Sequence, residues 1–192
     1  MPRSRATAVA GAVVVVAASF AVGLGAGRHS RHASGSGAFS WLRPAPPPPD
    51  WKVARSAAGA LAYPPGWTPI KTDPGSASVA LLGRGGAIHA YLNATPLQGD
   101  ETLANWTRFR PAHNKNEGSR AVRVLASSTN VNFRSGPGSC VIDDYTTSKA
   151  RYREIACFVS GASSSVIVAA APTALWEEQA VTLERAVSSF AS

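Results

Sequence analysis

Hydrophobic residues recur at helical spacing near the C-terminal end of the chain. The recurring apolar positions are Trp176, Ala180, Leu183, Val187 and Phe190. Intervals of three and four residues place them on one face of a helix. Thr173 is a candidate N-cap, and Glu177 and Glu178 follow it where the helix dipole favours negative charge. The pattern predicts an amphipathic helix that packs one face onto a core.

Shorter runs upstream are rich in apolar residues and end at glycine or proline, as strands do. The predicted strands lie within 59–67, 77–83, 87–95, 120–128, 131–135, 139–157 (as a hairpin) and 164–171. A further helix is predicted over 100–110, where Asp100 is a candidate N-cap and Leu103 and Trp106 share a face. Together these elements predict an α+β fold, with a largely antiparallel sheet covered by helices.

The stretch SCVIDDYTTSKARYREIAC, residues 139–157, can fold back on itself about Ser148–Lys149, so that paired positions sum to 297. The opposed residues are then Ile142 and Ile155, Tyr145 and Tyr152, and Asp144 and Arg153. Apolar, aromatic and opposite-charge pairs across strands contribute about 0.2–1 kcal/mol each. Asp143 opposite Glu154 disfavours this register, but a slip by one residue would turn every side chain to the other face. The three favourable pairs therefore predict this hairpin.

The same register places Cys140 opposite Cys157, the only two cysteines of the chain. Opposed residues have Cα atoms about 4.5–5.5 Å apart, which suits a disulfide. Two buried thiols or a zinc site are the alternatives, but the sequence has no C-x-x-C motif and no histidine near either cysteine. A disulfide persists in oxidising compartments, so we predict a domain outside the cytoplasm. A cytoplasm-facing domain with reduced cysteines is the alternative.

An uncharged stretch at residues 6–27 follows two arginines near the N-terminus. At about 1.5 Å per residue it is long enough to cross a bilayer core of about 30 Å. We predict that residues 1–27 form a single transmembrane helix in the cell membrane, with the domain on the extracytoplasmic side. Small residues near its end also permit cleavage as a signal peptide, which would leave a secreted protein.

The segment 28–50 is rich first in glycine and serine and then in proline. Gly/Ser sequence is flexible and proline-rich sequence is extended, which predicts a linker between the anchor and the domain. A docking site for a proline-binding module is the alternative. The folded domain is predicted over 51–192, a length that buries one substantial core.

The net charge of +8 divides evenly, with +4 in residues 1–50 and +4 in residues 51–192. The domain itself is therefore only mildly basic. Binding of nucleic acid normally needs a concentrated basic stripe, and none is visible in the sequence. We expect no nucleic-acid partner.

Signatures of catalysis and of metal binding are sparse. The sequence has no G-x-S-x-G motif, and neither His89 nor His113 has a recognisable partner. Asp143 and Asp144 are adjacent, so they point to opposite faces of a strand and cannot form a carboxylate dyad. Asp143 with Glu154 is expected as a solvated pair, with a weak calcium site or a raised pKa as the alternative. We predict no catalytic residue, no metal site and no cofactor.

Aromatic and basic residues lie close together in the run NWTRFR and in the arginines that follow it. As a hypothesis, they form a binding rim that contacts anionic lipid headgroups or acidic wall polymers. The rim residues are Trp106, Arg108, Arg110, Arg120 and Arg123. The alternative is an ordinary amphipathic helix, with Trp106 in the core and its arginines in solvent.

The blocks YPPGW, YLNATP, NWTRFR, SCVIDDYTT, REIACFV and AAAPTALW occur in this order between about Trp51 and Phe190. This order resembles a group of uncharacterised exported actinobacterial proteins, whose domain is similar to the PsbP-like α/β/α sandwich. That class includes the LpqN-like mycobacterial lipoproteins, although this chain lacks their lipid-anchor cysteine. Its members are mostly accessory or protein-binding modules without a catalytic centre.

The resemblance therefore implies a membrane-tethered, extracytoplasmic and non-catalytic binding module of the bacterial cell envelope. Its partner would be an envelope protein or an anionic envelope component. An envelope hydrolase, with a site assembled from residues far apart in the sequence, is the alternative.

Overall fold

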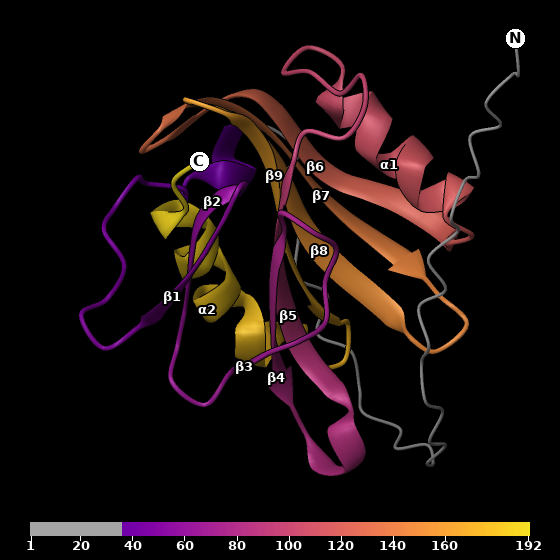
Figure 1. The fold of residues 1–192 in the computed structure, drawn as a ribbon. Coiled ribbons are helices and arrows are strands. Elements are labelled where there is room, and N and C mark those ends of the chain that lie inside the picture. Colours follow the sequence, from indigo (N-terminus) through magenta and orange to yellow (C-terminus); the bar gives the residue numbers. More distant parts are fainter. Residues whose placement is uncertain (1–35) are drawn as a thin grey trace, which may run out of the picture. The chain divides into compact units, whose positions relative to one another are not determined.

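The computed structural model describes residues 36–192, so the predicted membrane segment 1–27 lies outside it. The strands are β1 (Lys52–Ser56), β2 (Gly59–Tyr63), β3 (Thr68–Pro69), β4 (Ala77–Leu82), β5 (Ile88–Pro96), β6 (Arg120–Phe133), β7 (Gly136–Thr146), β8 (Arg151–Ser160) and β9 (Ser164–Pro172). The helices are α1 (Trp106–Asn116) and α2 (Trp176–Ser189), with 3-10 turns η1 (Ser36–Phe39) and η2 (Arg84–Gly86) (Figure 1). None of the helices between residues 36 and 192 is long and apolar enough to cross a membrane.

Seven of these strands form one sheet in the order β3-β4-β5-β9-β8-β7-β6. All neighbouring strands run antiparallel, and β1 and β2 form a separate antiparallel pair. The predicted α+β fold with a largely antiparallel sheet is confirmed for this part of the chain. The long strand β6 lies at one edge of the sheet.

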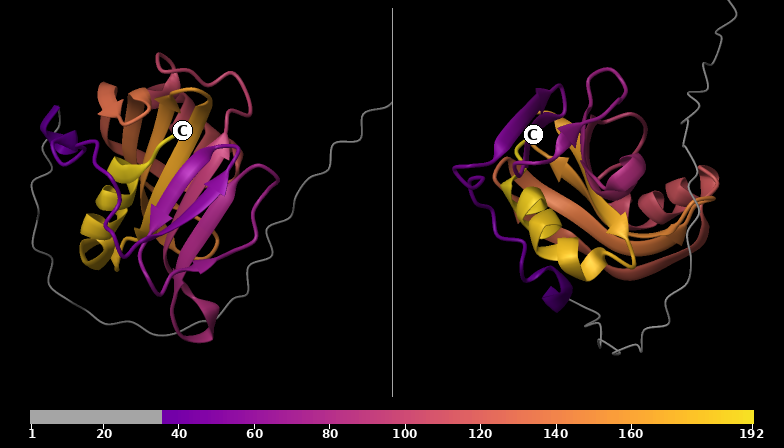
Figure 2. Two further views of the ribbon diagram at one scale, coloured as in Figure 1. Left: turned by 60° about the vertical axis from the view of Figure 1, so that its left-hand side comes forward. Right: turned by 90° about the horizontal axis from the view of Figure 1, so that it is seen from below.

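The two helices cover opposite faces of the sheet (Figure 2). Helix α1 lies over β6, β7 and β8, where Trp106 packs near Phe158. Helix α2 lies mainly over β9, and its Leu183 and Val187 are fully buried. Successive residues of a strand point to opposite faces, so each central strand contributes to both cores.

Helix α1 begins and ends later than the sequence pattern predicts. Asp100 does not cap it, because the chain first makes a turn closed by two side chains. In that turn the Thr102 N–H donates to Asn105 Oδ1 (2.7 Å) and the Asn105 N–H donates to Thr102 Oγ1 (3.2 Å). The helix then continues through Pro111 to Asn116.

The two strands predicted at 120–128 and 131–135 are one strand, β6, of 14 residues. Its pairing with β7 is irregular between Ser128 and Val131, and the strand continues across this irregularity. Bulges of this kind add a residue to one strand without ending the ladder. The apparent break in the hydrophobic pattern is therefore a bulge and not a turn.

Residues 36–50, which we call the N-terminal strap, pack onto the domain. Phe39 is buried in the α2-side core, and Trp41 packs against the same core. The Ala45 N–H donates to the carbonyl of Ser188 in α2 (3.2 Å). The ordered structure therefore extends into the predicted linker 28–50, because two aromatic side chains of that segment reach the core.

Candidate functional site

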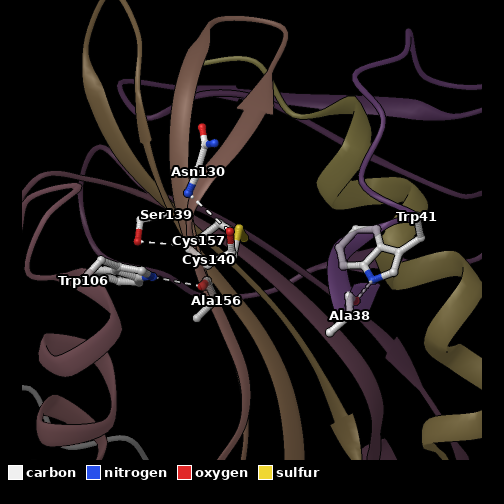
Figure 3. Close-up of a disulfide and its surroundings, with 9 residues drawn as sticks. Ala38, Trp41, Trp106, Asn130, Ser139, Cys140, Ala156 and Cys157 are labelled. Atoms are coloured by element: carbon white, nitrogen blue, oxygen red, sulfur yellow. Dashed lines mark hydrogen bonds between the residues drawn. A yellow bond between two sulfur atoms is a disulfide. The ribbon is translucent and has the colours of Figure 1, made fainter. Parts of the chain in front are cut away.

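The β7–β8 hairpin has the register predicted from the sequence. Each pair sums to 297, including Cys140 with Cys157 and Asp143 with Glu154. Cys140 and Cys157 form a disulfide with a Cα–Cα distance of 4.1 Å, and both are fully buried. Figure 3 shows the disulfide between the strap residue Trp41 on one side and Trp106 of α1 on the other. The predicted disulfide is confirmed.

Asp143 lies on the face of the sheet that α1 covers, and it is part of a buried polar cluster. Its partner across the hairpin is Glu154, and both side chains are inaccessible to solvent. Arg110 of α1 donates from Nε to Glu154 Oε1 (2.7 Å) and from Nη2 to Glu154 Oε2 (2.9 Å). Asn114, one helical turn later, donates from Nδ2 to Glu154 Oε1 (3.1 Å) and to Asp143 Oδ2 (3.3 Å). The cluster therefore ties α1 to β7 and β8.

The two carboxyl groups of this cluster have opposite pKa shifts. Burial, reinforced by the negative charge of Glu154, raises the pKa of Asp143 to about 8. Burial also acts to raise the pKa of Glu154, but the charge and hydrogen bonds of Arg110 outweigh it and hold this pKa below its ordinary value. At neutral pH the pair therefore holds one proton, on Asp143, and one negative charge, on Glu154.

The expectation of a solvated Asp143–Glu154 pair is wrong, and the alternative of a raised pKa is correct. Helix α1 packs over both carboxyls, with Trp106 donating from Nε1 to the carbonyl of Ala156 (2.9 Å). Among the buried side-chain nitrogen and oxygen atoms of residues 36–192, Asp143 Oδ1 and Glu101 Oε2 receive no hydrogen bond from a neighbouring donor. Catalytic use of these carboxyls would require α1 to move away.

Asp144 points to the other face, where it is surrounded by arginines. Arg153 donates from Nε to Asp144 Oδ1 (2.7 Å), and Arg151 donates from Nη2 to Asp144 Oδ2 (2.8 Å). Arg123 of β6 lies 3.5 Å from the same Oδ2. Burial acts to raise the pKa of Asp144, but the hydrogen bonds and charges of Arg153 and Arg151 outweigh it and lower this pKa. The Asp144–Arg153 pair predicted from the hairpin is confirmed.

The strand register arranges these side chains in two parallel rows. The first row is Arg123 on β6, Asp144 on β7 and Arg153 on β8. The second row is Arg120, Thr146 and Arg151 on the same three strands. Residues opposed across strands share a face of the sheet, so four arginines lie on one face, and three of them, Arg123, Arg151 and Arg153, pair with the Asp144 carboxylate. We call these six residues the arginine cluster.

A bulge in β6 brings Arg120 and Arg123 to the same face. Residues three apart on a regular strand point to opposite faces. The β6–β7 pairing shifts between Arg120 and Arg123, and Ala121 within the shift has φ = 51°, in the left-handed region. One extra residue in a strand re-aims the side chains beyond it.

The predicted rim residues do not form one surface. Trp106 is buried in the α1-side core, and Arg110 is held in the cluster with Glu154, so neither can belong to a rim. Both side chains point inward because α1 packs against the sheet through this face. Arg108 is exposed on α1, whereas Arg120 and Arg123 are exposed on the α2 side of the sheet. The lipid or polymer contact proposed for the rim stays a prediction.

The two histidines of the domain lie in different elements. His113 stacks on Phe109 of its own helix, with ring centroids 5.9 Å apart. His89 of β5 packs over Gly83, where an added Cβ would overlap its ring. Between residues 36 and 192 no group of three or more His, Cys, Asp or Glu side chains is placed to hold a metal ion.

Sequence reasoning missed several residues of these two clusters. Thr146 and Arg151 sum to 297, so the predicted hairpin already placed them opposite each other. Asn114 lies one turn after Arg110, but its contact with the hairpin depends on how α1 packs. The pairing of Arg120 and Arg123 with β7 depends on the bulge, and the sequence carries no clear signal for it.

Comparison with known proteins identifies the fold. No protein-family model matches the chain, and no curated protein matches its sequence. Cyanobacterial PsbP (CyanoP) from Synechocystis sp. PCC 6803 matches it with a TM-score of 0.54 and 14% sequence identity, over 73% of this chain and 91% of that one. This likeness shows a PsbP-like fold, as predicted, and at this identity it shows the fold alone.

Two further solved structures are less similar. A protein of unknown function, PA94 from Pseudomonas aeruginosa, matches with a TM-score of 0.43 and 9% identity, over 74% of this chain and 96% of that one. LpqN of Mycobacterium tuberculosis, described as involved in cell envelope biogenesis, matches with a TM-score of 0.35 and 16% identity, over 73% of this chain and 75% of that one.

Proposed function

We propose that this protein is a membrane-tethered, extracytoplasmic binding module of the bacterial cell envelope. It holds an anionic envelope component on the arginine cluster and performs no catalysis. The tether is the uncharged N-terminal segment at residues 6–27. The disulfide within the sheet supports a location outside the cytoplasm, because disulfides persist in oxidising compartments.

The arginine cluster is the observation that carries the proposed binding function. It has four arginines and one aspartate, and therefore a charge of +3 on one end of three neighbouring strands. The Arg123 and Arg151 side chains are 63% and 54% exposed although both lie near Asp144, so they can reach an external ligand as well. Arginine is suited to this role because its guanidinium presents five donors and always carries a charge.

Charge reversal at Arg120 tests the proposed binding function. Arg120 is exposed and takes part in no ion pair between residues 36 and 192. Arg120→Glu should weaken binding of the full chain to purified envelope fragments, and the loss should shrink with added salt, which screens exposed charges. Arg134→Glu is the matched control, because Arg134 is also exposed and unpaired within these residues and lies just after the other end of β6. Equal loss in both variants would contradict a specific role for the cluster.

The tether and the location need a separate measurement. The intact mass of the native protein, taken without reductant, should show one disulfide and an uncleaved N-terminus in the membrane fraction. A disulfide with residues 1–27 removed would identify a secreted protein, and two free thiols would overturn the proposed location.

A further inference from the structure

The two rows of the arginine cluster differ only at the central position. In the first row the Asp144 carboxylate lies between Arg123 and Arg153 and accepts hydrogen bonds from Arg153. In the second row the neutral Thr146 takes that position between Arg120 and Arg151. The first row therefore contains its own anion, whereas the second has two cations flanking a hydroxyl.

The geometry of the second row suits a small oxyanion. Neighbouring strands lie about 4.7–4.9 Å apart, so the backbones of Arg120 and Arg151 are roughly 9–10 Å apart across Thr146. Their guanidinium groups can both turn toward an anion above the Thr146 hydroxyl, just as Arg123 of β6 and Arg153 of β8 both reach the Asp144 carboxylate in the first row. Arg151 donates one hydrogen bond to Asp144, from Nη2, and its guanidinium has further donors.

We propose that the Arg120–Thr146–Arg151 row binds a phosphate group. This inference rests on the proposed function and names the chemistry of the anionic partner. The phosphate occupies in the second row the place that the Asp144 carboxylate has in the first.

The donors of the row favour phosphate over carboxylate. A carboxylate has two oxygens in one plane, and Asp144 already accepts hydrogen bonds from two arginines through its own two. Arg120, Thr146 and Arg151 carry their donors on three neighbouring strands, so each can meet a separate oxygen of a tetrahedral phosphate. Arginine pairs with phosphate through two parallel N–H···O bonds, which adds to the affinity.

Substitution of Thr146 tests the site without removing any arginine. Thr146→Asp gives the second row a carboxylate of its own and should weaken binding of phosphate at least about tenfold, because the row then contains its own anion. Thr146→Asn is the matched control, because asparagine has the shape of aspartate but no charge, and it should retain phosphate binding within about threefold. Titration of the full chain in uncharged detergent micelles with inorganic phosphate, at constant ionic strength, measures both effects. If Thr146→Asp fails to fold, Arg120→Gln, at an exposed position, replaces it with the same expected loss.

Further titrations separate the possible outcomes. Acetate should bind more weakly than phosphate. The phosphate site is overturned if the two anions bind equally, or if Thr146→Asp and Thr146→Asn lose the same affinity for phosphate. Either result still leaves the arginine cluster as a surface that binds anions. If the wild type binds no anion and Arg120→Glu leaves envelope binding unchanged, the proposed function fails as well.

The source of the phosphate is read from two arms of the same experiment. Soluble glycerol phosphate and vesicles containing phosphatidylglycerol should both lose affinity in Thr146→Asp. A larger loss in Thr146→Asp for the vesicles than for soluble glycerol phosphate assigns the group to a lipid headgroup, and the reverse assigns it to a soluble or polymeric phosphate. If Thr146→Asp binds both soluble glycerol phosphate and the vesicles as tightly as the wild type does, the inference is contradicted.

Discussion

Replacement of Asp143 by asparagine should remove most of the pH dependence of stability between pH 5 and 8. In the folded protein Asp143 is buried beside Glu154, which raises its pKa to about 8 from an unfolded value of 3.8. The folded state therefore holds a proton that the unfolded state releases. An acid with a raised pKa contributes stability that is present below the unfolded pKa and is lost as the pH rises toward the folded pKa.

The size of the effect follows from these two values. One proton retained by the folded state changes the free energy of unfolding by about 1.4 kcal/mol per pH unit, so the wild type should lose about 3–4 kcal/mol between pH 5 and pH 8. Glu154 does not interfere, because its lowered pKa confines its contribution to more acidic pH. Asparagine stays neutral and can donate a hydrogen bond to Glu154 in place of the protonated carboxyl. Asp143→Asn should therefore be close to the wild type at pH 5 and about 2–4 kcal/mol more stable at pH 8.

Urea denaturation of the full chain with its disulfide intact, at pH 5, 6, 7 and 8, measures this difference. The chain has five tryptophans, among them Trp106 in the α1-side core next to the cluster, so tryptophan fluorescence should report the unfolding of the domain. If the free energy of unfolding changes with pH equally in Asp143→Asn and in the wild type, or if Asp143→Asn is less stable at pH 8, the raised pKa of Asp143 is contradicted.

Asp144→Asn is the matched control, since it makes the same substitution one residue away. Asp144 has a lowered pKa, because Arg153 and Arg151 outweigh the effect of burial. This group contributes stability above its unfolded pKa that is lost only as the pH falls. Asp144→Asn should therefore cost about 1–3 kcal/mol throughout pH 5–8 and leave the pH slope unchanged.

Three further predictions concern the stability of the domain. Arg110→Ala should lower the free energy of unfolding by about 3–5 kcal/mol in urea denaturation, because it leaves the buried Glu154 charge without its partner; a cost below about 1 kcal/mol would show that the ion pair is not buried in solution. Phe39→Ala should cost about 3–5 kcal/mol and speed hydrogen exchange at the C-terminal end of α2, and an unchanged exchange rate there would show that the strap does not dock. Reduction of the Cys140–Cys157 disulfide, whose cysteines are separated by 17 positions in the sequence, should lower stability by about 3 kcal/mol, and equal denaturation midpoints with and without reductant would contradict this.

Much of the local structure could be predicted from the sequence. The hairpin register came from residue types at mirrored positions, and each predicted pair is present. The amphipathic helix near the C-terminus and the strands within 77–83 and 87–95 also came from local patterns, and each is confirmed. These elements depend on residues close together in the sequence, where periodicity and turn residues carry the information.

The start of α1 was less predictable. Asp100 resembled an N-cap, but Thr102 and Asn105 compete for the same backbone groups and delay the helix. Side chains of this type often hydrogen-bond to nearby backbone outside a helix as well as at its cap. A sequence pattern does not show which of several such side chains hydrogen-bonds to the backbone N–H groups before the helix.

The residue types along the hairpin were enough to predict which residues face each other, and with them the disulfide. The burial of Asp143 and Glu154 beneath α1 could not be predicted in this way, because it depends on how a helix distant in the sequence packs on the sheet. The arginine cluster depends likewise on the pairing of β6 with β7 and on a bulge that turns Arg120 to the side of Arg123. Local patterns specify the partners within a hairpin, whereas contacts between separate elements follow from packing of the whole domain, and the candidate site is built from such contacts.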